Sequence, residues 1–330
     1  MLLPDPDARR PMEPADFLKC IDDDERRDRY SAVLERLDPL AGVIRERFFA
    51  VDGIPDLRII KNAPKGDTEL RDIVGAVFIA DGLLDWFFEI DEFTRGFIDI
   101  QYPFGKWSVA KIGAMWAYAH EVFHFVRRHA LVEKHFGKSR DVRHALEFDA
   151  DMCAVAVIYR FVQFKENTGD ELQLKMAVLK SLFFIVRAEI DQSSIKEYEG
   201  SPTHPHTAAR LWDLVCKLSM LHDTGRTNPD FVNPISIQHS LVMLDMVKDL
   251  ERKYLMAKNR DFESSVIGDF LCQNSELKFT RSRHEQWDEI SRLIDYFSTL
   301  PREDVDNDKS IGFIVNGLFS MPSKHSDAGV

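Results

Sequence analysis

The chain has 330 residues and an apolar fraction of 45%, which is enough for one large domain or two small ones. Its 43 basic and 55 acidic residues give a net charge of −12, which argues against a broad surface for nucleic-acid phosphates. The four cysteines are scattered without a CxxC pair, so the sequence indicates reduced thiols rather than disulfides or a thiolate metal site.

The chain also lacks the signals of export or membrane insertion. Its first 19 residues, MLLPDPDARRPMEPADFLK, are broken by prolines and charges and contain no apolar core of a signal peptide. The longest apolar runs, such as SLFFIV at 181–186, are far too short to cross a bilayer. We therefore expect a cytoplasmic protein that binds neither membrane nor nucleic acid.

The N-terminal third combines a helical segment with two short strands. Residues 14–50 keep apolar side chains at helical spacing, whereas DLRIIKN at 56–62 and IVGAVFIAD at 73–81 are typical of strands. The second strand leads into Asp81-Gly82, a pair that favours a turn. A small sheet within residues 55–105 is expected.

From Ser108 onward nearly every segment has helical periodicity. The expected helices cover 109–130, 142–165, 170–191, 207–220, 235–257 and 284–299. The predicted fold is therefore α+β and mostly helical, with a small sheet beside the helix at 109–130. We divide the chain into an N-terminal helical segment (1–52), a main domain with C-terminal helices (53–300) and a polar tail (301–330).

The first candidate site is the pattern His120-Glu121-x-x-His124. Residues four apart lie one turn apart on one helix face, so both imidazoles can point at the same ion. Glu121 lies about 100° around the axis, where a carboxylate can take a proton from an activated water. The motif alone leaves two interpretations open: a zinc site, or a helix whose histidines are incidental.

A catalytic zinc needs a third protein ligand and an open fourth position. A metzincin would need Gly and His at positions 127 and 130, which are Arg127 and Ala130 here. Glu147, on the next helix, is the better third ligand. Asp151 lies one turn beyond it and can accept the second N–H of a ligand histidine. Ala150 and Ala154 keep this helix slim enough for close packing.

Helix length bears on the remaining histidines. From Asp141 to Glu147 the second helix rises only about 9 Å. An antiparallel first helix should therefore end near Ala130, which leaves LVEKHFGKSR (131–140) as a loop. His129, His135 and His144 are then expected to be surface or loop residues rather than ligands.

A third element is the loop and helix SPTHPHTAARLW at 201–212. His204 lies in a breaker-rich loop and can donate a hydrogen bond to the oxyanion that forms during peptide hydrolysis. Arg210, six residues later, can brace it or bind a carboxylate. The alternative is that His204 caps the helix and Arg210 forms a surface ion pair.

Taken together, these motifs resemble those of gluzincin zinc metallopeptidases. HExxH, Glu147-x-x-Ala150-Asp151 and His204-Pro205-x-x-x-x-Arg210 are similar to elements of the HtpX and CAAX-prenyl-protease group, whose members are usually membrane-embedded. The chain more closely resembles the family of the soluble phage-exclusion peptidase Lit, including a C-terminal stretch similar to SSVIGDFLC (264–272). The resemblance covers roughly residues 75–275 and implies a zincin-like core.

The resemblance implies a zinc endopeptidase that cleaves a protein substrate during phage defence. His120, His124 and Glu147 would bind Zn²⁺, Glu121 and His204 would be catalytic, and Asp151 and Arg210 would support the ligands or the substrate. One alternative is a protease-like regulatory or sensor protein with bound zinc and little activity, since a latent protease awaiting an activating partner would have the same motifs. A second is a helical interaction module with incidental histidines.

Overall fold

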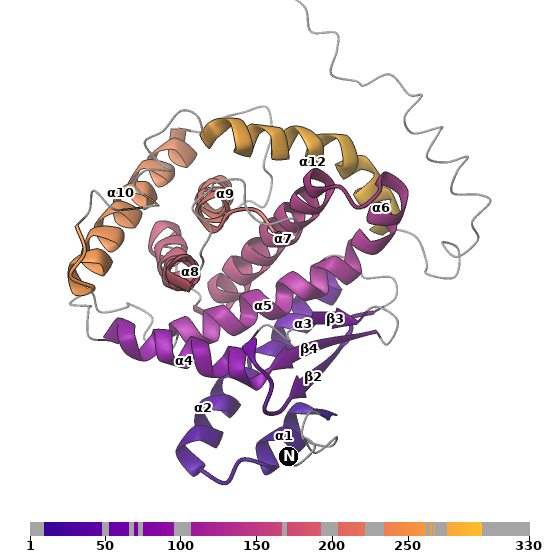
Figure 1. Cartoon of the computed structure of the whole chain (residues 1–330), viewed down its shortest axis with the longest axis vertical. Helices are drawn as coiled ribbons and strands as arrows, with labels where there is room; N and C mark the ends of the chain where they lie inside the picture. Colours follow the sequence, from indigo (N-terminus) through magenta and orange to yellow (C-terminus); the bar gives the residue numbers. More distant parts are fainter. Residues whose placement is uncertain are drawn as a thin grey trace, which may run out of the picture.

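The computed structural model confirms a mostly helical α+β protein. It describes residues 10–47, 53–65, 69–71, 75–95, 107–166, 170–192, 204–221, 234–261, 265, 267 and 276–298. The predicted tail at 301–330 lies outside these residues, as does the stretch 264–272 apart from Ser265 and Ile267. A helix at the centre of the molecule, α5 (Val109–Val126), has the sheet on one side and most of the later helices on the other (Figure 1).

The sheet contains four short strands in the order β1-β2-β4-β3. They are β1 (Pro11–Met12), β2 (Asp56–Ile60), β3 (Glu69–Arg71) and β4 (Ala76–Ala80). β4 pairs in parallel with β2 and antiparallel with β3, and all five of its residues are buried. Because β4 has a partner on each side, it is an interior strand and cannot accept a substrate as an added edge strand.

The N-terminal segment forms three helices rather than a continuous one. They are α1 (Pro14–Lys19), α2 (Asp24–Leu34) and α3 (Leu37–Arg47). The Asp23 carboxylate caps α2 by accepting the Arg26 backbone N–H at 2.8 Å, which starts a new helix at that point. Phe17 and Tyr30 are fully buried in the core that also contains α5. The division at residue 52 stays a prediction.

The segment after β4 is a helix, α4 (Asp81–Arg95), and not the turn that Asp81-Gly82 suggested. The Asp81 carboxylate accepts the backbone N–H groups of Asn62 and Ala63, at 2.9 and 3.0 Å. A Cβ on Gly82 would lie only 2.4 Å from the Ala63 carbonyl oxygen. The Asp-Gly pair therefore fastens the start of α4 to the loop after β2, since only glycine permits this close approach.

The later helices agree with the predicted ones within two residues, except for the last. They are α7 (Arg140–Glu166), α8 (Glu171–Gln192), α9 (Thr207–Met220) and α10 (Pro234–Ala257), while α12 (Glu276–Ser298) begins before the expected residue 284. In Figure 1, α10 and α12 lie along the outer edge of the helical part, and α12 packs against α7. Among the described helices, none has both the length and the apolar character needed to cross a bilayer.

The prediction that a loop follows the first motif helix is wrong. α5 ends at Val126, and α6 (His129–Phe136) occupies most of the expected loop. The turn between them depends on Arg128, whose φ of 56° lies in the left-handed region and redirects the chain. Val132 of α6 is then buried against Ile290 and Leu293 of α12, which accounts for the extra helix.

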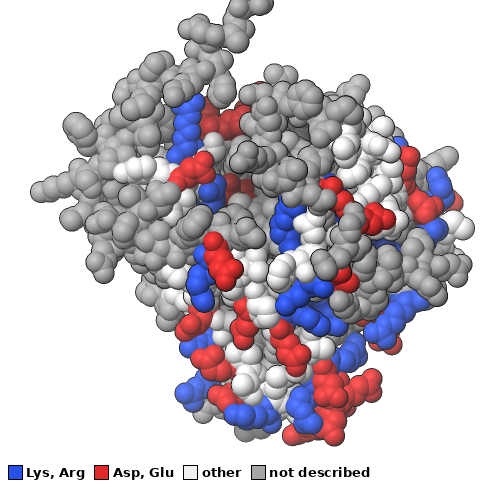
Figure 2. All heavy atoms as spheres, turned by 180° about the vertical axis from the view of Figure 1, so that it is seen from behind, with Lys and Arg blue, Asp and Glu red and all other residues white. Residues whose placement is uncertain are grey.

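Charged side chains of both signs are interspersed on the face shown in Figure 2. At the end of the molecule built from α1 and α2, Lys19 pairs with Asp16 at 2.8 Å and Arg27 pairs with Asp24. Arg26 of α2 also contacts Asp85 of α4 at 2.6 Å. These exposed pairs contribute little to stability. The contact of Arg26 does, however, connect the N-terminal helices to α4.

Candidate metal centre

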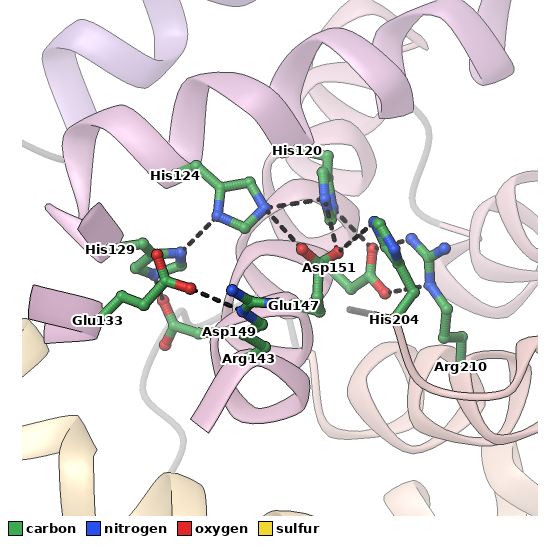
Figure 3. A network of polar contacts seen from close by, with 10 residues as sticks. All are labelled: His120, His124, His129, Glu133, Arg143, Glu147, Asp149, Asp151, His204 and Arg210. Atoms are coloured by element: carbon green, nitrogen blue, oxygen red, sulfur yellow. Dashed lines mark hydrogen bonds and ion pairs between the residues drawn. The ribbon is translucent and has the colours of Figure 1, made fainter. Parts of the chain in front are cut away.

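The structure brings His120, His124 and Glu147 to one point between α5 and α7. Their ligand atoms all lie within 4.8 Å of one another. The two Nε2 atoms are 3.0 Å apart, His120 Nε2 is 3.2 Å from Glu147 Oε2, and His124 Nε2 is 3.4 Å from Glu147 Oε1 (Figure 3). The three predicted ligands thus form a compact triangle, which could hold a metal ion.

α5 and α7 pack against each other, and both carry small buried residues. Ala119 of α5 and Ala150 and Ala154 of α7 are fully buried in the main core. Small side chains allow two helix backbones to approach closely. Such close packing suits the short reach of Glu147 to the two histidines.

One atom of the triangle is poorly satisfied by the protein alone. Glu147 Oε2 is buried and receives no hydrogen bond of good geometry from the described residues, although His120 Nε2 lies 3.2 Å away. A poorly satisfied buried carboxylate oxygen is costly, and a cation held by two imidazoles and this carboxylate would remove that cost. The donor set and this oxygen both fit a metal ion.

Behind the triangle, His120 is held by Asp151 as the sequence predicted. His120 Nδ1 lies 2.9 Å from Asp151 Oδ1, so the ring N–H donates to the carboxylate and Nε2 faces the centre. Arg210 of α9 donates to the same carboxylate from Nε at 2.7 Å and from Nη2 at 2.8 Å. Its side chain is only 12% exposed and stacks on Trp116. Arg210 therefore braces Asp151 rather than His204, and it is not a surface residue.

His204 lies on the open side of the triangle. Its Nε2 is 3.5 Å from Glu147 Oε2, and its side chain is 54% exposed. The helix cap in this loop is His206, whose Nδ1 accepts the Ala208 backbone N–H at 3.1 Å. The cap of α9 is therefore His206 and not His204, which lies next to the centre.

Glu121 follows His120 on α5 and is partly buried. Because consecutive helix residues differ by about 100° in direction, its carboxylate flanks the face that carries the two imidazoles. Its catalytic role stays a prediction.

The carboxylates and imidazoles strongly perturb one another. Burial opposes a charge on His120, but Glu147 and Asp151 outweigh it and raise the pKa of this imidazole to about 10. Burial, together with the nearby imidazoles of His120 and His129, lowers the pKa of His124 to about 3 despite the opposing effect of Glu147. The pKa of the Glu147 carboxyl lies well below its ordinary value, because His124 and His120 outweigh the effect of burial. Without a metal, His120 is therefore in its doubly protonated, charged form, and Glu147 and Asp151 are ionised.

Sequence reasoning missed two members of this cluster. His129 was expected at the surface, but it is only 3% exposed, and its Nδ1 lies 2.8 Å from His124 Nδ1. Its Nε2 lies 3.1 Å from Oδ2 of Asp149, a buried residue that the sequence had not singled out. His144 is also buried, whereas His135 is exposed and stacks on Phe297, as a surface histidine can.

The comparisons with known proteins support a peptidase. Residues 106–227 match the family model Peptidase U49, and this stretch contains every candidate residue of the centre. Lit, whose family the sequence resembles, is a U49 peptidase. No curated protein and no solved structure matches the chain.

Proposed function

We propose that the chain is a zinc-dependent endopeptidase of the gluzincin type, with His120, His124 and Glu147 as ligands. The observation that carries the proposal is the ligand triangle, which lies inside the stretch that matches a peptidase family. In a tetrahedral zinc site with bonds of about 2.0–2.2 Å, neighbouring ligand atoms are about 3.3–3.6 Å apart. The observed separations of 3.0, 3.2 and 3.4 Å are close to that spacing.

The residues around the triangle supply acid–base chemistry. A bound zinc ion would polarise the scissile carbonyl and acidify water toward neutral pH. Glu121 accepts the proton of the attacking water and returns it to the leaving nitrogen. His204, on the open side, donates a hydrogen bond to the carbonyl oxygen as it gains negative charge. Asp151 keeps His120 in the tautomer that presents Nε2 to the metal.

We place its action in the cytoplasm and in phage defence, with a protein or peptide as substrate. The role in phage defence rests on the sequence resemblance. The substrate motif and the cleavage site do not follow from the centre.

The metal requirement gives a direct test. Purified protein should contain about one zinc per chain by elemental analysis, and His124→Ala should contain almost none, since two ligands hold zinc poorly. Profiling of new protein N-termini in cells should find cleavage products with the wild type and not with His124→Ala. Absence of zinc from the wild type would contradict the proposal, and zinc without any new N-termini would favour the regulatory or sensor protein.

Zinc binding should strengthen as the pH rises. The metal-free centre holds a proton on His120, whose pKa of about 10 keeps the charged form dominant at any pH below that value. Zinc must displace this proton, whereas the low pKa of His124 means that it has none to lose. The apparent affinity should therefore rise about tenfold per pH unit between pH 6 and 9. Competition with a chelator of known pH dependence measures this, and a pH-independent affinity would contradict it.

A further inference from the structure

The second ligand, His124, has a chain of buried polar contacts behind it. His124 Nδ1 lies 2.8 Å from His129 Nδ1, and His129 Nε2 lies 3.1 Å from Asp149 Oδ2. In Figure 3 this chain leads away from the triangle on the side opposite to Asp151 and Arg210. His129 and Asp149 are 3% and 2% exposed, so water cannot readily substitute for either of them.

The positions of the protons along this chain follow from the donors and acceptors. A neutral His124 that ligates a metal through Nε2 carries its hydrogen on Nδ1. That N–H can donate only if Nδ1 of His129 has a free lone pair, which puts the hydrogen of His129 on Nε2. The Nε2–H then donates to the Asp149 carboxylate. A single arrangement therefore satisfies every ring nitrogen in the chain.

The end of the chain is itself firmly held. Arg127, at the C-terminus of α5, donates to Asp149 Oδ2 from Nε at 2.9 Å and to Oδ1 from Nη2 at 3.1 Å. Trp287 of α12 donates to Oδ1 at 2.9 Å. Arg127 and Trp287 together give the Asp149 carboxylate three hydrogen bonds, which favour its charged form. A fixed anion at this position favours the tautomer of His129 with hydrogen on Nε2.

We propose that His129 and Asp149 are positioning residues that orient His124 toward the metal. The inference rests on the proposed function, because it needs His124 to be a ligand. Each of the two ligand histidines then has a buried carboxylate behind it, and an arginine holds each carboxylate. His120 donates directly to Asp151, which Arg210 clamps, and His124 donates through His129 to Asp149, which Arg127 clamps. His129 is the first residue of α6, so the start of this helix places it between the ligand and the carboxylate.

Three variants of the full chain test the inference through zinc affinity, measured by chelator competition. His129→Leu fills the same space with an apolar side chain but removes the hydrogen bonds to His124 and Asp149. Zinc affinity should therefore fall about 10–100-fold. His129→Gln can accept from His124 through Oε1 and donate to Asp149 through Nε2, so it should recover most of that loss. Glu133→Gln is the control. It removes the 2.7 Å ion pair between Glu133 of α6 and Arg143 of α7, but it leaves the hydrogen bonds of His129 in place. Its affinity should equal that of the wild type.

The outcomes separate the inference from the proposed function. If the wild type binds zinc and His129→Leu binds it equally well, or if His129→Gln loses as much as His129→Leu, the positioning role is overturned and the peptidase proposal stands. If the wild type binds no zinc, both are overturned. Nitrogen NMR of the histidine rings in the zinc-loaded wild type needs no variant. It should find the Nε2–H tautomer for His129, and the Nδ1–H tautomer would overturn the inference.

Discussion

Glu121→Gln should leave zinc in the protein and reduce peptide cleavage by about 10²–10⁴-fold, the usual contribution of a general base. Glutamine has nearly the same shape as glutamate but cannot take a proton from the attacking water. Glu121 is not among the three residues whose ligand atoms converge, so the metal content should not change. Single-turnover cleavage of a substrate found by N-terminal profiling measures the loss, with zinc determined on the same sample.

Glu46→Gln provides the matched control for this variant. Glu46 lies exposed on α3, and the same change of charge there should leave cleavage unaffected. Undiminished cleavage by Glu121→Gln would remove the general-base assignment. Loss of zinc from Glu121→Gln would instead indicate that Glu121 supports the metal, and the loss of activity would then have a different cause.

The parts of the centre that the sequence could predict are those that depend on helix geometry alone. His120 and His124 are one turn apart, as are Glu147 and Asp151, and a helical pattern suffices to put each pair on one face. If the two helices are neighbours, both pairs meet. In the structure the distance between His120 Nε2 and Glu147 Oε2 is 3.2 Å. The order of the motifs along the chain indicated that pairing.

The parts that the sequence could not predict depend on a turn and on distant contacts. His129 comes five residues after His124, which on a continuous helix would place it on another face. The left-handed conformation of Arg128 brings it back toward His124, and nothing in the composition of that segment signals such a conformation. One of the donors that hold Asp149 is Trp287, 138 residues away in the chain. A contact at that separation leaves no local periodicity to read.

A similar reason explains the error at Asp81-Gly82. The pair is a strong turn signal after a strand, and a turn was therefore expected. Here the carboxylate of Asp81 and the missing side chain of Gly82 serve a contact with Ala63, in a loop that comes earlier in the chain. Local propensity correctly marked these two residues as the end of the strand. The contact with Ala63 determined that a helix follows them.

Arg210→Leu should destabilise the protein by about 3–5 kcal/mol, the usual cost of leaving a buried charge without its partner. Asp151 is 2% exposed and accepts two hydrogen bonds from the Arg210 guanidinium. The guanidinium also lowers the pKa of the Asp151 carboxyl below its ordinary value, so its removal should favour the protonated acid. A protonated Asp151 accepts less strongly from His120, and zinc affinity should therefore fall together with stability. Denaturant unfolding and chelator competition measure the two effects.

Two further variants decide what Arg210 does. Arg210→Lys keeps the positive charge but cannot form the paired hydrogen bonds, so its losses should lie between those of the wild type and Arg210→Leu. Arg252→Leu removes an arginine from a surface pair with Asp249, and the stability of this variant should change by less than about 0.5 kcal/mol.

If Arg210→Leu instead folds with unchanged stability and zinc affinity and only raises the KM for peptides, Arg210 binds a substrate carboxylate. The sequence had left that role open. The 2.7 Å bond from Arg210 Nε to Asp151 argues against it, because this bond already engages the guanidinium inside the protein.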